Sequence, residues 1–483
     1  MYDQIYKRID DALWKDSGCG SELDYVEQSS WILFLKYLDD LETNRQMEAE
    51  LDGRPFEPIL DEKYRWSTWA VPKKADGAKD LSKTLTGDDL RRFVVDGLFP
   101  YLRSFKKADI AADTLQYKIG EIFNGVQCKL TSGYVMRDVF DAVDELRFQS
   151  SEDQHEMSFL YESRIGRMGN AGRNGGEYYT SRPLIRAIIS VIDPKIGETV
   201  YDGACGSAGF LCEAFLYLLK KCRTARDRET LQKRTLFGKE KKALPFVIGT
   251  MNMILHGVEA PNILLTNTLE ENLFNIQPSQ QVDVVLANPP FGSNSERAEI
   301  KQNFTFKSGE TAYLFLEHFM RMLKPGGRAG IVIKNTFLSN GDAAGLRKML
   351  LEDCNLFAVL DLPQKVFTAG VKTVVLFFEK GKPTKKVWFY QLDPGRSLGK
   401  TNPLNEDDLA EFVKLAKRRP DSANSWTVNV ADLDPETFDL TVKNPNKQVE
   451  TVQRSPQTIA QEMAAIDKEN AALLADILKV LGK

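Results

Sequence analysis

The sequence has few of the residues that bind metals or form disulfides. It contains three histidines, and its six cysteines are scattered without a CxxC pair. That distribution offers neither the ligand spacing of a zinc site nor the cysteine framework of a small secreted domain. We therefore expect no bound metal, and reduced thiols that lie mostly in the core.

Long apolar runs and an excess of basic charge are also missing. No run reaches the roughly 18 apolar residues of a membrane span, and the first residues are acidic and amphipathic instead of basic and apolar. We expect a cytoplasmic protein that does not associate with membranes. The net charge of −4 excludes a protein whose whole surface binds nucleic acid, because phosphate contacts come from clustered Lys and Arg.

The domain organisation follows from length and periodicity. The chain has 483 residues, more than one ordinary domain, and its 42% hydrophobic and 27% charged residues are typical of a globular protein. Residues 1–160 show helical periodicity broken by polar loops, which predicts an all-helical N-terminal domain. A Gly-rich, basic stretch at 166–176 marks the boundary to a second domain, predicted over 161–395.

The second domain alternates strand-length apolar runs with helical patterns. That alternation is typical of a Rossmann-like α/β fold with a mainly parallel, doubly wound sheet. Helical patterns at 209–219, 244–256 and 313–323 separate several of the runs. The runs that predict a seven-stranded sheet are 199–201, 235–238, 263–265, 282–286, 329–333, 357–360 and 373–378.

The last part of the chain divides into an irregular extension, expected over 396–454, and a helix over 455–483. Ser455-Pro456 offers an N-cap and a first-turn proline for that helix. Its heptad positions suit packing against a partner, although packing on the chain's own helical domain is the alternative. These positions are Ile459, Met463, Ile466, the polar Asn470, Leu473, Ile477 and Val480.

A glycine-rich turn and an acid suggest a pocket for an adenosine-containing ligand. Asp202 to Phe210 follows the first strand of the α/β domain and opens a helix, so its glycines permit a tight turn and close approach to a ligand. Glu240 ends the next strand, where a carboxylate can accept hydrogen bonds from both ribose hydroxyls. Taken alone, a structural turn and an exposed acid are the alternatives.

The tetrapeptide Asn288-Pro289-Pro290-Phe291 ends the strand 282–286, at the edge where open α/β sheets bind ligands. An exocyclic amine is a poor nucleophile because its lone pair is conjugated into the ring. The Asn288 side-chain carbonyl and the Pro289 backbone carbonyl can accept both amine protons and free that lone pair. Phe291 offers a flat face for an extruded base. A proline-rich loop without chemistry is the alternative.

The segment from Glu177 to Arg182 directly follows the Gly-rich stretch and runs into an amphipathic helix. Its aromatic and hydroxyl side chains at a helix N-terminus can line a pocket and contact the carboxylate of an amino acid. A hinge strand with a helix cap is the alternative. The residues of this segment are Glu177, Tyr178, Tyr179, Thr180, Ser181 and Arg182.

Along the chain the segment Glu177 to Arg182 comes first, the glycine loop Asp202 to Phe210 second and the tetrapeptide Asn288 to Phe291 third. In that order, the three motifs resemble those of the modification subunit of type I restriction–modification systems, a gamma-class adenine-N6 DNA methyltransferase. Residues 157–162 and the segments 438–441 and 444–445 resemble the same family, so nearly the whole chain is covered. The resemblance implies a bacterial or archaeal enzyme that uses S-adenosylmethionine. It implies cofactor contacts from Glu177 to Arg182 and from Gly206, Ser207, Ala208 and Glu240, with Asp202 anchoring the loop and Asn288 to Phe291 holding the adenine.

No element of this sequence is suited to read base edges, so target recognition is expected from another subunit. The family resemblance implies the same. Expected partners are double-stranded DNA with a flipped adenine, a specificity subunit and a second copy of this chain, with a restriction subunit as a further candidate. Two positions depart from the family: Gly203 replaces a usual proline, and Asn267 stands where an acid is common. A protein-glutamine or RNA amine methyltransferase is the alternative function.

Overall fold

The computed structural model describes most of the chain in two compact units, Met1–Lys443 and Asn444–Lys483. None of the helices in the described part is long and apolar enough to cross a membrane. The residues left undescribed are 1, 75, 108, 147–157, 159–160, 167–178, 293–296, 368–369, 400, 447–456, 458–459, 462, 465, 469, 472 and 475–483.

The N-terminal region is helical, as predicted. Its longest helix is α2, which Ser21 caps by accepting a hydrogen bond from the Asp24 backbone N–H at 3.2 Å. The buried Trp31 ring of α2 packs edge-on against Phe99 and Phe140. The elements are α1 (Tyr2–Leu13), α2 (Glu22–Leu51), η1 (Glu62–Tyr64), α3 (Trp66–Trp69), α4 (Gly87–Arg92), η2 (Phe93–Leu98), α5 (Phe99–Arg103), α6 (Leu115–Gly125) and α7 (Gly133–Asp144).

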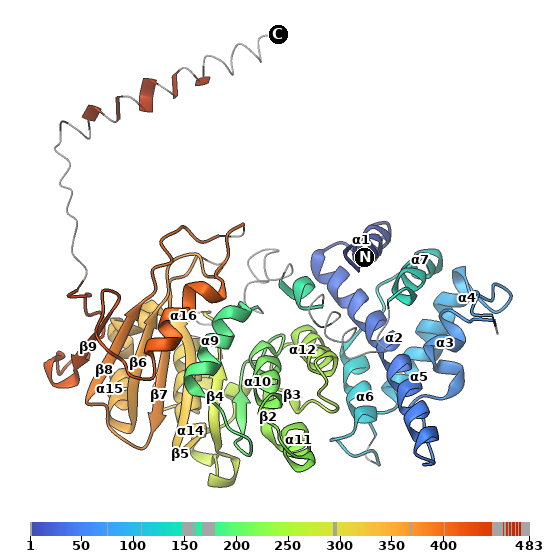
Figure 1. The fold of residues 1–483 in the computed structure, drawn as a ribbon, viewed down its shortest axis with the longest axis horizontal. Coiled ribbons are helices and arrows are strands. Elements are labelled where there is room, and N and C mark those ends of the chain that lie inside the picture. Colours follow the sequence, from blue (N-terminus) through green and yellow to red (C-terminus); the bar gives the residue numbers. More distant parts are fainter. Residues whose placement is uncertain are drawn as a thin grey trace. The chain divides into compact units, whose positions relative to one another are not determined.

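A nine-stranded sheet forms the α/β part, with strand order β3-β2-β1-β4-β5-β7-β6-β8-β9 (Figure 1). All strand pairs are parallel except those made by β7 and β9. The seven predicted runs are the first seven strands, and two more extend the sheet. The strands are β1 (Val200–Asp202), β2 (Leu236–Glu240), β3 (Ile263–Leu265), β4 (Val282–Ala287), β5 (Leu323–Lys334), β6 (Cys354–Asp361), β7 (Thr373–Lys380), β8 (Lys386–Gln391) and β9 (Ser425–Asn429).

Helices cover both faces of the sheet, so its central strands are buried on both sides. One face packs against α9 (Arg182–Ile192), α10 (Gly209–Leu219), α12 (Ala243–Leu255) and α16 (Glu406–Leu415), and the other against α14 (Thr311–Met322) and α15 (Ala344–Asp353) (Figure 1). Along β4, the side chains of Val284 and Leu286 lie in the core on the α9 side of the sheet. Those of Val285 and Ala287 lie in the core on the α14 side. This period of two is the alternation expected of a strand.

Shorter helical segments complete the connections between these elements. They are α11 (Ala225–Thr230), η4 (Leu231–Thr235), η5 (Thr268–Glu270), η6 (Leu273–Asn275), η7 (Pro278–Gln280), α13 (Ala298–Lys301), η8 (Asn335–Leu338), η9 (Gly341–Ala343) and η10 (Val430–Asp432).

The expectation of an irregular extension over 396–454 is wrong, because α16 and β9 lie within it. A capping box begins α16: the Asn405 side chain accepts from the Asp408 N–H, and the Asp408 carboxylate accepts from the Asn405 N–H. Phe412 of α16 then stacks on Trp388 of β8, and Trp426 of β9 stacks on Phe389. Aromatic contacts with β8 therefore order a segment whose own pattern is weak.

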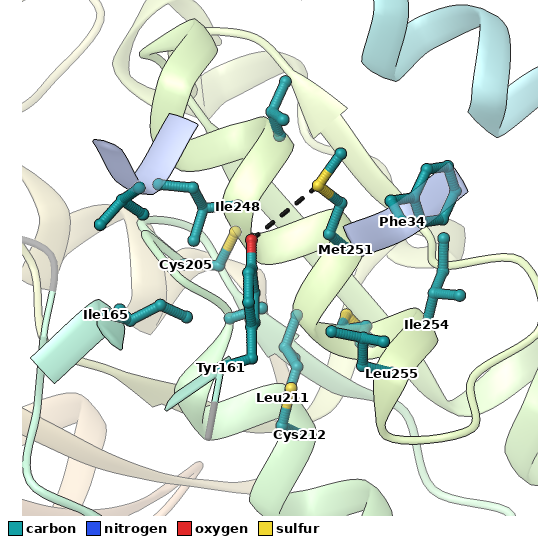
Figure 2. Packing of buried hydrophobic residues seen from close by; sticks show 14 of the residues in the cluster. Phe34, Tyr161, Ile165, Cys205, Leu211, Cys212, Ile248, Met251, Ile254 and Leu255 are labelled. Atoms are coloured by element: carbon teal, nitrogen blue, oxygen red, sulfur yellow. Dashed lines mark hydrogen bonds between the residues drawn. The ribbon is translucent and has the colours of Figure 1, made fainter. Parts of the chain in front are cut away.

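The helical and α/β parts share one hydrophobic core around Tyr161, which Figure 2 shows among Phe34, Cys205, Met251 and other apolar residues. The Tyr161 hydroxyl lies 2.9 Å from Ser30 Oγ of α2 and 3.9 Å from Met251 Sδ of α12. Cys205, which belongs to the glycine loop, is buried in this core. Its burial raises the pKa of the thiol well above the ordinary value, so it is a packing residue and not a nucleophile.

Candidate active site

A pocket lies at the carboxyl ends of β1, β2 and β4. It brings the glycine loop, the acid that ends β2 and the Asn-Pro-Pro-Phe tetrapeptide together, as the position of strand ends in a parallel sheet predicts. The residues that line it are Gly203, Ala204, Gly206, Glu240, Lys241, Lys242, Asn267, Thr268, Asn288, Pro290 and Phe315.

Glu240 fixes the glycine loop. Its carboxylate accepts hydrogen bonds from the Gly206 N–H at 2.9 Å and from the Lys242 N–H at 2.8 Å. Gly206 has φ +52°, a left-handed conformation that favours glycine. Burial raises the pKa of Glu240 above its ordinary value. The Lys241 backbone is a third contact, and a carboxylate has about four acceptor positions, so Glu240 retains acceptor capacity for a ligand hydroxyl.

Asp202 anchors the start of the same loop. Its Oδ1 accepts a hydrogen bond from the Ala204 N–H at 3.0 Å, and the side chain is almost fully buried. Burial, with a smaller contribution from the Glu240 charge, raises the pKa of Asp202 to about 8. Asp202 therefore stabilises the backbone of the loop, and it does not line the pocket.

Asn288 directly follows β4 and faces the pocket. Its Nδ2 donates to Thr180 Oγ1 at 2.9 Å, whereas its Oδ1 is buried with no hydrogen-bond partner among the described residues. Buried acceptors are almost always paired, so an orphaned one needs an explanation. An amide oxygen at a pocket edge is suited to accept a proton from a ligand amine.

Phe291 ends the tetrapeptide and is partly buried. Its ring packs edge-on against Phe367, with centroids 5.9 Å apart and an interplanar angle of 90°. Phe367 lies between β6 and β7, and the sequence analysis did not select it. The same is true of Phe315, an α14 residue of the pocket wall, because an aromatic residue in a helical pattern looks like an ordinary core residue.

Of the predicted segment 177–182, Glu177 and Tyr178 lie outside the described residues. Thr180 reaches the site through Asn288. Ser181 Oγ is buried without a partner among the described residues. Arg182 does not line the pocket: its guanidinium lies over the Tyr179 ring and pairs with a buried carboxylate, Glu162.

Glu162 is the centre of a buried polar network that the sequence analysis did not select. It pairs with Arg182 through two hydrogen bonds, and its Oε1 accepts from Asn252 Nδ2 at 3.1 Å. The same Nδ2 donates to the Ser207 carbonyl at 2.9 Å, which links the network to the glycine loop. Burial opposes the charge of Glu162, yet the Arg182 guanidinium holds the pKa of Glu162 below its ordinary value.

Donor atoms of Glu162, Cys212 and His256 lie within 4.8 Å of one another, the one such cluster among the described residues. The carboxylate is already paired with Arg182, whose positive charge disfavours a cation at this position. His256 Nδ1–H donates to the Asn252 carbonyl at 2.8 Å, and burial lowers the pKa of His256. We therefore assign the cluster to an ion-pair network.

Gly203, one of the two departures from the family pattern, has a structural reason. A Cβ at this position would lie 2.8 Å from the Tyr201 hydroxyl oxygen and 2.9 Å from the Phe319 ring. A proline ring would therefore clash with side chains of this chain. The other departure, Asn267, lines the pocket, and its Oδ1 accepts from the Leu269 N–H at 3.2 Å.

The strand order, the glycine loop and the Asn-Pro-Pro-Phe tetrapeptide define an amino-group methyltransferase. A protein-family model described as N-6 DNA Methylase matches residues 152–454, and one described as HsdM N-terminal domain matches residues 3–143. The chain belongs to the N-6 DNA methylase family, and within it to the modification subunits of type I restriction–modification systems. It is an adenine-specific DNA methyltransferase, and its family implies S-adenosylmethionine as the methyl donor.

Relatives cover the chain from end to end. The type I restriction enzyme EcoEI methylase subunit of Escherichia coli is 34% identical, over 99% of this chain and 97% of the relative. The crystal structure of a modification subunit of a putative type I restriction enzyme from Vibrio vulnificus has a TM-score of 0.81 at 36% identity, over 92% of this chain and 96% of the other. A chain from a study of complex assembly in a type I system has a TM-score of 0.78 at 37% identity, over 99% and 98%.

Proposed function

We propose that this chain methylates N6 of an adenine flipped out of duplex DNA, with Asn288 and Pro289 activating the amine. The observation that supports this role is the buried, unpartnered Asn288 Oδ1 at the edge of the pocket. Asn288 Oδ1 and the Pro289 carbonyl accept the two amine protons, so the nitrogen lone pair is released from conjugation. S-adenosylmethionine, when bound, supplies the electrophilic methyl group.

The cofactor is held by residues of the glycine loop and the segment before α9. Glu240 accepts hydrogen bonds from the ribose hydroxyls, while Gly206, Ser207 and Ala208 allow the loop to approach the ligand, with Asp202 as its anchor. The remaining contacts come from the predicted segment Glu177, Tyr178, Tyr179, Thr180, Ser181 and Arg182. For Arg182 the pairing with Glu162, and for Thr180 the hydrogen bond from Asn288, favour an indirect contribution, through the position of this segment. The mechanism requires no metal.

Phe291 stacks on the extruded adenine, which has lost its neighbours in the duplex. The edge-on contact with Phe367 fixes the Phe291 ring plane, so the stacking surface is present before DNA binds. Pro290, which lines the pocket, limits the backbone freedom of the tetrapeptide. These residues therefore position the base, and Asn288 with Pro289 activates its amine.

Glu240→Ala is expected to weaken S-adenosylmethionine binding by about 10- to 100-fold, because hydrogen bonds to a charged group contribute about 1.5–3 kcal/mol each. Calorimetric titration of the cofactor measures the effect. Glu271→Ala is the matched control. Glu271 pairs with Lys239, the residue before Glu240 in β2, but does not line this pocket, so its removal should leave cofactor affinity unchanged. An unchanged affinity of Glu240→Ala contradicts the ribose assignment.

Target recognition belongs to a separate specificity subunit, and two copies of this chain assemble with it, with a restriction subunit as a further partner. The solved structure that is 37% identical to this chain, with a TM-score of 0.78, comes from a study of complex assembly in a type I system, which supports assembly with partner subunits. In residues 455–483, the described positions are helical, and Met463, Ile466 and Leu473 are about half exposed. An exposed apolar seam at heptad spacing favours packing against partner helices.

Deletion of 455–483 tests this assembly role. We expect the shortened chain to fold with an unchanged melting temperature but to lose stable association with the specificity subunit in size-exclusion chromatography. Replacement of Lys468 by Ala, a polar position off the seam, is the control that should assemble normally. Normal assembly of the shortened chain would refute the helix's role.

A further inference from the structure

We propose that Thr180 is a positioning residue for methyl transfer, because its hydroxyl holds the Asn288 amide with Oδ1 toward the target amine. The inference rests on the proposed role of Asn288 and deepens it. Thr180 is separated from Asn288 by 108 positions in sequence, yet its Oγ1 accepts the Asn288 Nδ2 hydrogen bond at 2.9 Å. The contact joins the segment before α9 to the end of β4.

An asparagine amide has two ends of nearly equal shape but opposite hydrogen-bonding character. The torsion that exchanges them is broad and roughly two-fold, so sterics alone select neither end. If Nδ2 faced the adenine amine, two donors would oppose each other and the lone pair would stay conjugated. Activation therefore requires an acceptor partner for Nδ2 on the side away from the amine.

Thr180 supplies that acceptor, since Asn288 Nδ2 donates to its Oγ1. A hydroxyl can also donate, so the contact fixes the place of the amide, and the Nδ2 pairing leaves Oδ1 for the amine. Its side chain is buried, with the residue 9% exposed, so water competes poorly for the contact. With Nδ2 bound to Thr180, the Asn288 Oδ1 is left without a partner among the described residues. A target amine that donates to this oxygen completes the pairing of both ends of the amide.

The support behind Thr180 is rigid. Two residues later, Arg182 is fixed by its ion pair with the buried Glu162. The guanidinium also lies against the start of α10, since a Cβ built on Gly209 would lie 1.8 Å from Arg182 Nη1. Arg182, the first residue of α9, is thus held against α10 two positions after Thr180.

Thr180→Val and Thr180→Ser separate this role from a simple cofactor contact. Valine keeps the shape but removes the acceptor, so we expect kcat for adenine methylation by the assembled enzyme to fall about 10- to 100-fold, with S-adenosylmethionine affinity within about twofold of wild type. Serine keeps the hydroxyl and should retain kcat within about threefold. Thermal melting of each variant, with Thr180→Ala as a second deletion of the hydroxyl, checks folding.

A double-mutant cycle shows whether Thr180 acts through Asn288. In an Asn288→Ala background, Thr180→Val should cause no further loss of the residual rate. An unchanged kcat of Thr180→Val and Thr180→Ala, a weakened cofactor affinity with normal kcat, or additive losses in the double variant would each overturn the positioning role. A wild-type enzyme that fails to methylate adenine overturns the proposed function itself, which is a different result.

Discussion

Asn288→Ala is expected to lower the rate of adenine methylation by about 10²- to 10³-fold or more while S-adenosylmethionine affinity stays within about threefold of wild type. The variant removes the acceptor that draws on the amine protons, and removal of one preorganised hydrogen-bonding group of this kind costs about 10²–10³ in kcat. The cofactor pocket keeps its glycine loop and Glu240, whose hydrogen bonds do not involve Asn288. Single-turnover methylation and cofactor titration give the two quantities.

Asn288→Asp is the matched variant. A carboxylate keeps acceptor oxygens at the same position, and the Thr180 hydroxyl can donate to it in place of the lost Nδ2 contact. We expect partial activity, well above that of the alanine variant. Full activity of Asn288→Ala would show that the amine is activated by another group.

Breaking the buried Glu162–Arg182 pair is expected to have the largest effect on stability. Removing one partner leaves a buried charge, which costs about 3–5 kcal/mol in comparable pairs. Both side chains are about one-tenth exposed, and Glu162 has further contacts with Asn252. Arg182→Met and Glu162→Gln should therefore each lower the free energy of unfolding in urea.

The controls for this prediction use an apolar replacement and a surface pair. Arg182→Met combined with Glu162→Met should recover much of the stability, because two apolar side chains leave no unpaired charge. Asp89→Ala breaks the exposed pair with Arg92 and should leave the melting temperature unchanged. A melting temperature that the single variants do not change would show that the pair is not coupled to folding.

The same pair predicts a pH dependence. The pKa of Glu162 is lower in the folded chain than its ordinary value, since burial, which raises the pKa, is outweighed by Arg182, His256 and Asn252 together. Its contribution to stability is thus present above the ordinary carboxyl pKa and is lost as the pH falls through the lowered value. The difference in stability between wild type and Glu162→Gln should shrink in acid.

The strands that carry the site were predictable, whereas the strands at the far edge were not. The predicted runs of β1 to β7 are short and apolar, and all but β3, whose Leu264 and Leu265 are exposed, are largely buried, so periodicity alone identifies them. β9 is a five-residue strand with a mixed burial pattern, and its pairing with β8 depends on the contact of Trp426 with Phe389. No local pattern encodes that distant contact.

The same distinction holds in the site. Gly206, Glu240 and Asn288 meet because each lies at or just after the end of a parallel strand, and parallel strands end at one edge of the sheet. Glu162 gave no such signal, because an acid in a helical pattern is usually exposed. Its burial depends on Arg182, 20 positions later in the chain. Asn288 was predicted to activate an amine, but its pairing with Thr180 required the three-dimensional structure.

The chemical identity of the methyl acceptor tests the central claim most directly. The assembled enzyme, with its specificity subunit, is incubated with methyl-labelled S-adenosylmethionine and duplex DNA that contains its target, and the digested products are separated by chromatography. The account predicts label on N6-methyladenine with wild type and its loss with Asn288→Ala. Label on protein, on RNA or on another base would contradict it.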